Sequence, residues 1–188
     1  MLPRIVTYAL IFSASLMRLA EAETALPGVR FDVMPVGCLI HSQYGDGTEW
    51  IEAFVGKKGQ RYVTKTYLGP AKAGKLNNLI STITYDANGF MIKRLWSTGK
   101  WESFEPYSCF SKPGACSYTY RNADGSNEKY IGKVVKKGKR VVSSGGFEGS
   151  PPFADTVFDM GPFNNIDRFR EGGTTYKVTS YENCGLGS

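Results

Sequence analysis

Short runs of β-branched and aromatic residues alternate with Gly-containing turn pairs along most of this chain. Such runs are typical of antiparallel strands, and few segments have the periodicity of a helix. The clearest hairpin spans residues 83–92, where Asn88-Gly89 is suited to the positive φ of a tight primed turn. The pattern predicts strands near 37–43, 50–55, 61–68, 79–86, 89–96, 100–107, 116–121, 129–135, 140–145, 155–159, 166–171 and 174–182.

Alternation within these strands is partial. Tyr62, Thr64 and Thr66 share one face of their strand, but Trp50, Glu52 and Phe54 do not share one chemical character. This pattern predicts an all-β fold, an antiparallel meander with one buried face, which is either closed into a barrel or folded into a sandwich.

The chain also repeats itself. Pro-Val-Gly-Cys at 35–38 recurs as Pro-Gly-Ala-Cys at 113–116, and Asp46-Gly47 recurs at the same spacing as Asp124-Gly125. A duplication of this kind predicts two degenerate tandem repeats of about six strands each, packed as one unit with pseudo-twofold symmetry. The predicted segments are a signal peptide at 1–22, a lead-in at 23–34, and repeats at 35–109 and 113–184.

The first residues have the composition of a secretory signal. Arg4 is followed by an apolar stretch over residues 5–17, and Ala20-Glu21-Ala22 supplies small residues for cleavage. We expect a secreted or periplasmic protein without a transmembrane segment. A retained N-terminal anchor is the alternative.

Four cysteines in an exported chain predict two disulfides. The repeat favours Cys38–Cys109 with Cys116–Cys184, one bond in each copy. The alternative scheme joins Cys109 to Cys116 and Cys38 to Cys184. Because loop-closure entropy does not separate the two schemes, symmetry alone favours the first.

The sequence offers little for catalysis or for metal binding. His41 is the only histidine, and no cysteine pair has the close spacing of a zinc site. Asp46 and Asp124 occupy equivalent positions, but each precedes Gly, as an aspartate that stabilises a turn does. We therefore expect no cofactor, no metal and no enzymatic activity. A small hydrolase or lyase that uses carboxylates stays open as a less favoured alternative.

Two basic turns occupy equivalent positions in the repeats. If they lie on one side of the molecule, they form a divided cationic surface for an anionic polymer, a lipid head group or a cell-surface glycan, without specific nucleic-acid recognition. Alternatively, these charges only solubilise hairpin ends and protect strand edges. The residues are Lys57, Lys58 and Arg61 in the first copy and Lys136, Lys137, Lys139 and Arg140 in the second.

Trp96 and Trp101 flank another turn and are candidates for stacking on a sugar ring or a base. The alternative is that both belong to the core.

Together these patterns predict a non-catalytic binding or structural protein that is mildly basic, with a net charge of +6. A β-barrel carrier of a small apolar ligand is the principal alternative. It predicts a deep cavity lined by residues such as Phe54, Ile83, Phe90, Val134 and Val157.

Overall fold

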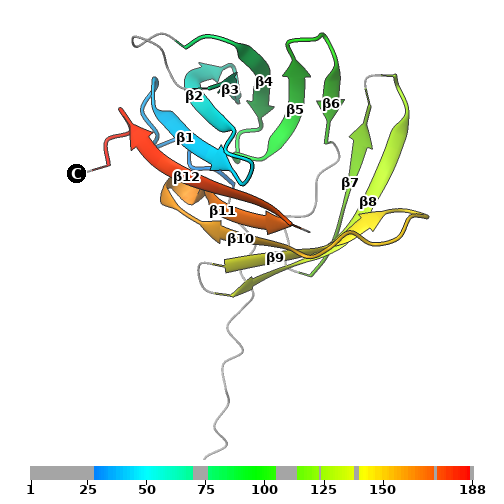
Figure 1. The fold of residues 1–188 in the computed structure, drawn as a ribbon. Coiled ribbons are helices and arrows are strands. Elements are labelled where there is room, and N and C mark those ends of the chain that lie inside the picture. Colours follow the sequence, from blue (N-terminus) through cyan, green and yellow to red (C-terminus); the bar gives the residue numbers. More distant parts are fainter. Residues whose placement is uncertain are drawn as a thin grey trace, which may run out of the picture.

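The fold is a closed antiparallel β-barrel of twelve strands (Figure 1). The computed structural model describes residues 28–69, 76–104, 114–122, 124–137, 140–171 and 173–186. Within these ranges the only helical element is η1, a 3-10 turn at Pro162–Asn164. The strands are β1 (Leu39–Tyr44), β2 (Glu49–Lys58), β3 (Arg61–Leu68), β4 (Leu79–Tyr85), β5 (Met91–Trp96), β6 (Trp101–Ser103), β7 (Gly114–Arg121), β8 (Asn127–Lys137), β9 (Arg140–Phe147), β10 (Thr156–Met160), β11 (Ile166–Glu171) and β12 (Thr174–Glu182).

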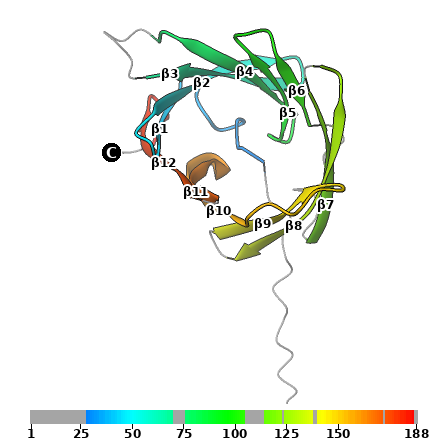
Figure 2. The same cartoon turned by 45° about the vertical axis from the view of Figure 1, so that its right-hand side comes forward.

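The all-β prediction is confirmed, and each predicted strand overlaps one observed strand. Every strand pairs with its neighbours in sequence, and β1 pairs with β12, from Leu39 opposite Glu182 to Tyr44 opposite Tyr176. This pairing converts the meander into a ring, which Figure 2 shows nearly end-on. Closure limits the unpaired sheet edges. The shortest join is between β6 and β7, where Ser103 lies opposite Arg121. The two-repeat organisation and its pseudo-symmetry remain a prediction.

Local side-chain hydrogen bonds hold the turns of the barrel. Asp46 accepts the backbone N–H of Thr48, and Asp124 accepts that of Ser126, both at 2.8 Å. The backbone bond lowers the pKa of Asp46, and the Ser126 hydroxyl, which donates to Asp124 at 2.6 Å, contributes most to the lowered pKa of Asp124. These bonds confirm that the two aspartates stabilise turns.

The hairpin at Asn88-Gly89 differs from the predicted primed turn. Asp86 N–H donates to the carbonyl of Phe90, so the loop has three residues, and only Gly89 has a positive φ, of 82°. The Asp86 carboxylate also accepts the N–H groups of Asn88 and Phe90. These two additional hydrogen bonds to Asp86 favour a type I turn with a glycine bulge over the two-residue turn.

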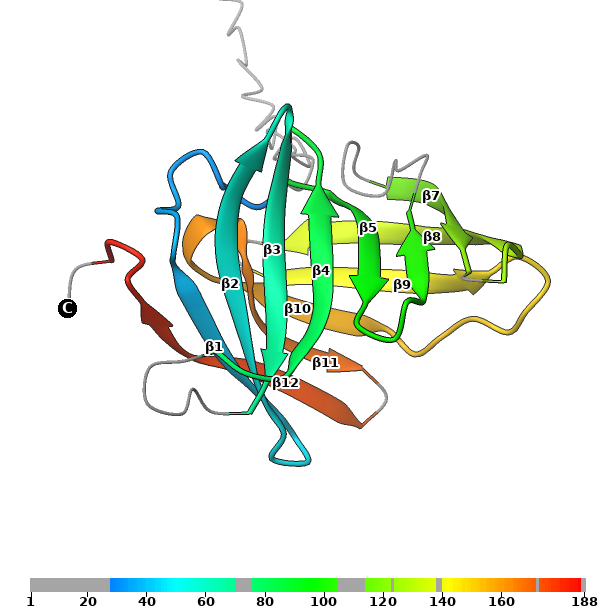
Figure 3. The ribbon, with the colours of Figure 1, turned by 90° about the horizontal axis from the view of Figure 1, so that it is seen from above.

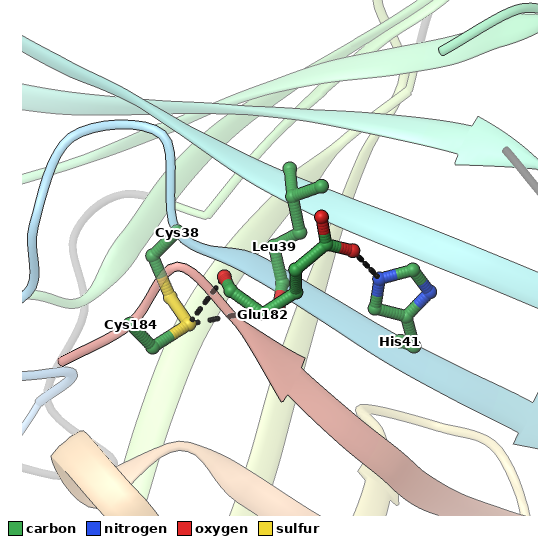
Figure 4. Close-up of a disulfide and its surroundings, with 5 residues drawn as sticks. All are labelled: Cys38, Leu39, His41, Glu182 and Cys184. Atoms are coloured by element: carbon green, nitrogen blue, oxygen red, sulfur yellow. Dashed lines mark hydrogen bonds and ion pairs between the residues drawn. A yellow bond between two sulfur atoms is a disulfide. The ribbon is translucent and has the colours of Figure 1, made fainter. Parts of the chain in front are cut away.

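The disulfide is the main correction to the sequence analysis. Cys38 bonds to Cys184 across 146 residues, with a Cα–Cα distance of 4.5 Å (Figure 4). The favoured pairs, Cys38–Cys109 and Cys116–Cys184, are therefore wrong. Pairing of β1 with β12 places Cys38 and Cys184 beside each other at the seam of the barrel, and this neighbourhood overrides the symmetry argument. Cys109 and the side chain of Cys116 lie outside the described residues, so their pairing remains a prediction.

The segment that precedes β1 closes one end of the barrel. Figure 2 shows residues 28–37 inside the ring of strands, next to η1. Phe31 is 4% exposed, and its ring centroid lies 5.0, 5.2 and 4.6 Å from those of Phe54, Tyr62 and Tyr85. Backbone bonds hold the segment in place, from Val29 N–H to the Gly89 carbonyl and from Arg30 N–H to the Phe163 carbonyl. We call residues 28–37 the plug.

We predict that Cys38→Ala/Cys184→Ala lowers the free energy of unfolding by about 2 to 5 kcal/mol, because the bond closes a very long loop of the unfolded chain. Urea denaturation measures the change, and reduced wild-type protein should match the variant. A non-reducing peptide map that joins Cys38 to Cys109 would contradict the assignment.

Phe31→Ala should lower the free energy of unfolding by about 3 to 5 kcal/mol, since it removes a buried ring from an aromatic cluster. Val33→Ala is the matched control in the same segment. Val33 is 55% exposed, and its truncation should change stability by no more than about 0.5 kcal/mol. Equal effects of the two variants would show that the plug does not pack as described.

Candidate ligand cavity and charged surfaces

The register of the first strands directs a mixed set of side chains into the barrel. Glu52, Thr66, Ser81 and Trp96 lie opposite one another across β2 to β5. Trp50 and Glu52, which break the expected alternation of β2, both line the internal cavity. The side chains of β2 that do not fit a simple apolar–polar alternation therefore face the lumen.

A cavity of about 310 Å³ lies inside the barrel below the plug. One part of its wall is aromatic and apolar, and another part carries the polar groups Glu52, Thr66 and Arg94. The apolar contributors include Tyr44, Ile83, Phe158, Met160, Phe169 and Tyr176.

Three polar atoms of the cavity wall are buried without a hydrogen-bond partner. They are the indole Nε1 of Trp50, the hydroxyl of Thr66 and the guanidinium Nε of Arg94. A buried donor that makes no bond costs about 1 to 3 kcal/mol. Unpartnered donors in a cavity wall indicate a place where an acceptor can bind.

Arg94 has only weak counterparts within the barrel, and its one hydrogen bond in the described residues is from Nη2 to the Sδ of Met91 at 3.9 Å. Its Nη1 lies 4.0 Å from Oε2 of Glu102, and its guanidinium lies 5.1 Å from the centre of the Trp96 ring. Glu102 is engaged elsewhere, because it accepts the Trp96 indole N–H at 3.0 Å. Burial, followed by a hydrogen bond to Glu102, raises the pKa of Tyr120 to about 12. The Glu102 carboxylate is thus shared among several donors, and the Nε–H of Arg94 has no acceptor.

Glu52 is held by a buried phenol. The Tyr85 hydroxyl donates to Oε1 of Glu52 at 2.9 Å, and burial together with this carboxylate raises the pKa of Tyr85 well above 10.0. Burial likewise raises the pKa of Tyr176 and brings that of Tyr181 to about 12. The phenols of Tyr85 and Tyr176 in the lumen therefore stay neutral above pH 10, where an ordinary tyrosine ionises.

The structure distributes the predicted cavity residues over three environments. Ile83 and Phe90 line the cavity. Phe54 and Val134 are buried in two separate hydrophobic clusters, and Val157 lies in a hollow of the outer wall. Sequence reasoning did not single out Arg94 or Trp50 for this site. The only available signal for the polar wall was Glu52, which interrupts an otherwise apolar strand face.

Trp96 and Trp101 do not form one aromatic platform. Trp96 faces the lumen beside Arg94 and Glu102, whereas Trp101 pairs with Leu95 on the opposite face of the sheet. There the Trp101 ring lies under Lys93 and Arg121, at 5.3 and 5.5 Å from the centroid. His41 also lies outside, with Nε2 3.1 Å from a carboxylate oxygen of Glu182 (Figure 4).

The strand ends that flank the two basic turns lie at the same end of the barrel, since β2 and β8 run in the same direction, but they are six strands apart. In the first turn the Lys57 ammonium lies 5.5 Å from the Tyr62 ring centre, and Lys58 pairs with Arg61. The side chains of Lys136 and Lys137, and the whole of Lys139, lie outside the described residues. Arg140 makes an ion pair with Asp159 at 3.1 Å.

Comparisons of this chain with protein-family models, with curated proteins and with solved structures find no match. The described residues include no helix of the length and apolarity needed to cross a membrane. Their His, Cys, Asp and Glu side chains form no group of three or more that could hold a metal ion.

The raised phenol pKa values predict a loss of stability at high pH. An unfolded tyrosine ionises near pH 10.0, while folded Tyr85 and Tyr176 stay protonated above it. The unfolded state then binds fewer protons than the folded state, so the free energy of unfolding falls as pH rises above 10 and is unaffected below it. Urea denaturation between about pH 8 and pH 11 measures this slope.

Tyr85→Phe/Tyr176→Phe should flatten the alkaline slope, whatever its effect on absolute stability. Tyr67→Phe, on the outer face of β3, is the matched control. An unchanged slope in the double variant would show that these phenols do not cause the pH dependence.

Proposed function

We propose that this protein is an exported, disulfide-linked β-barrel that binds a small ligand in its lumen without catalysis. The ligand class is a compact amphipathic molecule with an apolar or ring-shaped body and one anionic or strongly accepting group. Export is supported by the buried Cys38–Cys184 bond, which persists in oxidising compartments, and by the signal-like composition of residues 1–22.

One observation carries the proposal: Trp50 and Arg94 present buried, unpartnered N–H donors to one cavity. A ligand acceptor that reaches these donors satisfies groups that cost free energy in the empty barrel. Because Arg94 is a cation, a carboxylate, sulfonate or phosphate gains more than a neutral acceptor.

The rest of the wall suits an apolar body. Phe158, Phe169 and Tyr176 line the same cavity, and aromatic walls of this kind bury flat or branched apolar groups. A volume of about 310 Å³ lies at the small end of the range for ligand sites, which favours a compact ligand over a long acyl chain.

Contact of the basic hairpin tips with an anionic surface is the second candidate function. Its support is that the strand ends that flank both tips lie at one end of the barrel. Their separation by six strands makes it the less favoured proposal, because affinity for a polyanion depends on several convergent charges.

We expect anilinonaphthalenesulfonate, which combines an aromatic body with a sulfonate, to bind saturably and to change Trp50 fluorescence. Arg94→Gln should weaken binding roughly tenfold or more, since it removes a charge-assisted bond. Arg121→Gln, which removes an equal charge on the outer face, is the matched control. Equal affinities of the two variants, or binding without saturation, would contradict a lumen site.

Trp50→Phe separates the ligand contact from packing, because it keeps an aromatic ring and removes the N–H donor. Ligand affinity should fall a few-fold, while the stability of the ligand-free protein should stay the same or rise, since an unpartnered buried donor is lost. Equilibrium titration and urea denaturation of the same samples test both effects.

A further inference from the structure

The wall of the barrel carries a second hollow, which shares Tyr44, Phe169 and Tyr176 with the lumen cavity but none of its basic residues. It has a volume of about 580 Å³ and lies over β9 to β12, beside the β1–β2 turn. Gly45 N–H donates to the Thr175 carbonyl at 2.9 Å, and this bond holds the turn against β12. Four basic side chains line the hollow: Arg140, Arg168, Arg170 and Lys177. We call it the cationic groove.

Strand register brings these cations together from three different strands. Arg140 lies opposite Asp159, Asp159 opposite Arg168, and Arg168 opposite Lys177, so four residues form one row across β9 to β12. Arg170 lies two positions along β11 from Arg168, on the same face. Neighbouring strands are about 4.8 Å apart, and alternate residues of a strand about 6.6 Å apart. The four cations therefore lie within roughly 15 Å of one another.

The groove has an excess of positive charge. Asp159 is its only carboxylate among the described lining residues, and it pairs with Arg140 at 3.1 Å. None of the carboxylates whose side chains are described forms an ion pair with Arg168, Arg170 or Lys177, and all three are exposed. Three convergent cations thus remain available to an anionic ligand.

The shape and composition of the groove narrow the ligand class. Phe169 and Tyr176 alternate with the basic residues, and their rings stack on each other at 5.1 Å, on the lumen side of the sheet. A single-stranded nucleic acid needs free rings on which its bases stack. The three rings of the groove lining, Tyr44, Phe169 and Tyr176, pack on one another at 5.1 to 6.1 Å. A concave hollow also fits a chain better than it fits the flat surface of a bilayer.

We propose that the cationic groove binds an anionic glycan through its sulfate or phosphate esters. Arginine guanidinium groups make paired hydrogen bonds to such oxyanions, and a glycan chain that carries several charged esters can contact several of these cations at once. This site shares no basic residue with the β2–β3 turn and does not depend on a ligand in the lumen.

The test uses full-length mature protein and a heparin oligosaccharide as the probe, with affinity measured by calorimetry at several salt concentrations. Arg168→Gln/Arg170→Gln/Lys177→Gln should weaken binding roughly tenfold or more and reduce its salt dependence. Lys57→Gln/Lys58→Gln/Arg61→Gln removes the same charge from the β2–β3 turn and should change affinity less than about twofold. Asp159→Asn, which removes the groove carboxylate, should tighten binding a few-fold.

Each result decides the proposal. Greater loss in the turn variant than in the groove variant would overturn it in favour of the hairpin tips. Tighter binding of single-stranded DNA or of anionic vesicles than of heparin, abolished by the groove variant, would overturn the glycan assignment. If the groove variant binds anilinonaphthalenesulfonate as the wild type does, its barrel is folded. Its loss of heparin binding then concerns the cationic groove and not the lumen site.

Discussion

The pairing of β1 with β12 is the contact on which the rest of the molecule depends. Hydrogen bonds between Leu39–Tyr44 and Thr174–Glu182 join the two ends of a twelve-strand meander. The Cys38–Cys184 bond lies at one end of this seam, where Figure 4 shows it beside Glu182 and Leu39. Without this pairing the sheet would have two long open edges and no lumen. The cationic groove would also lose its wall, since the β1–β2 turn packs against β12.

A barrel of this width cannot be filled by side chains from its strands alone. Barrels of about eight strands are just wide enough for side chains to fill, and this barrel has twelve. The plug occupies one end and forms a hydrophobic cluster with Phe54 and Tyr85. Tyr130, Val134 and Val141, on β8 and β9, form a second, smaller cluster. Figure 3 shows β2–β4 crossing over β9 and β10 on the opposite wall, and the cavity lies between these walls.

The polar part of that cavity contains buried charges whose hydrogen bonding is incomplete. Glu52, Arg94 and Glu102 are directed inward, where each charge needs a partner. Tyr85 and Trp96 supply hydrogen bonds to the two carboxylates, but Arg94 and Trp50 keep unused donors. An apolar core of equal volume would often be as stable or more stable than such buried charges, so these groups are not explained by stability alone. This pattern makes the lumen the principal candidate site.

The sequence by itself determined the local structure. Strand positions followed from β-branched and aromatic runs, and the turn geometry of Asp46 and Asp124 followed from side-chain bonds that span two residues. Glu52 was visible as an irregularity, but its partner Tyr85 lies 33 positions away. Only the tertiary structure decided which cysteines bond, which strand closes the ring and which basic residues converge. The disulfide and the ring depend on the pairing of β1 with β12, which brings residues more than a hundred positions apart into contact. The convergence of the basic residues depends on the register of β9 to β12. No local pattern encodes either the distant pairing or the register.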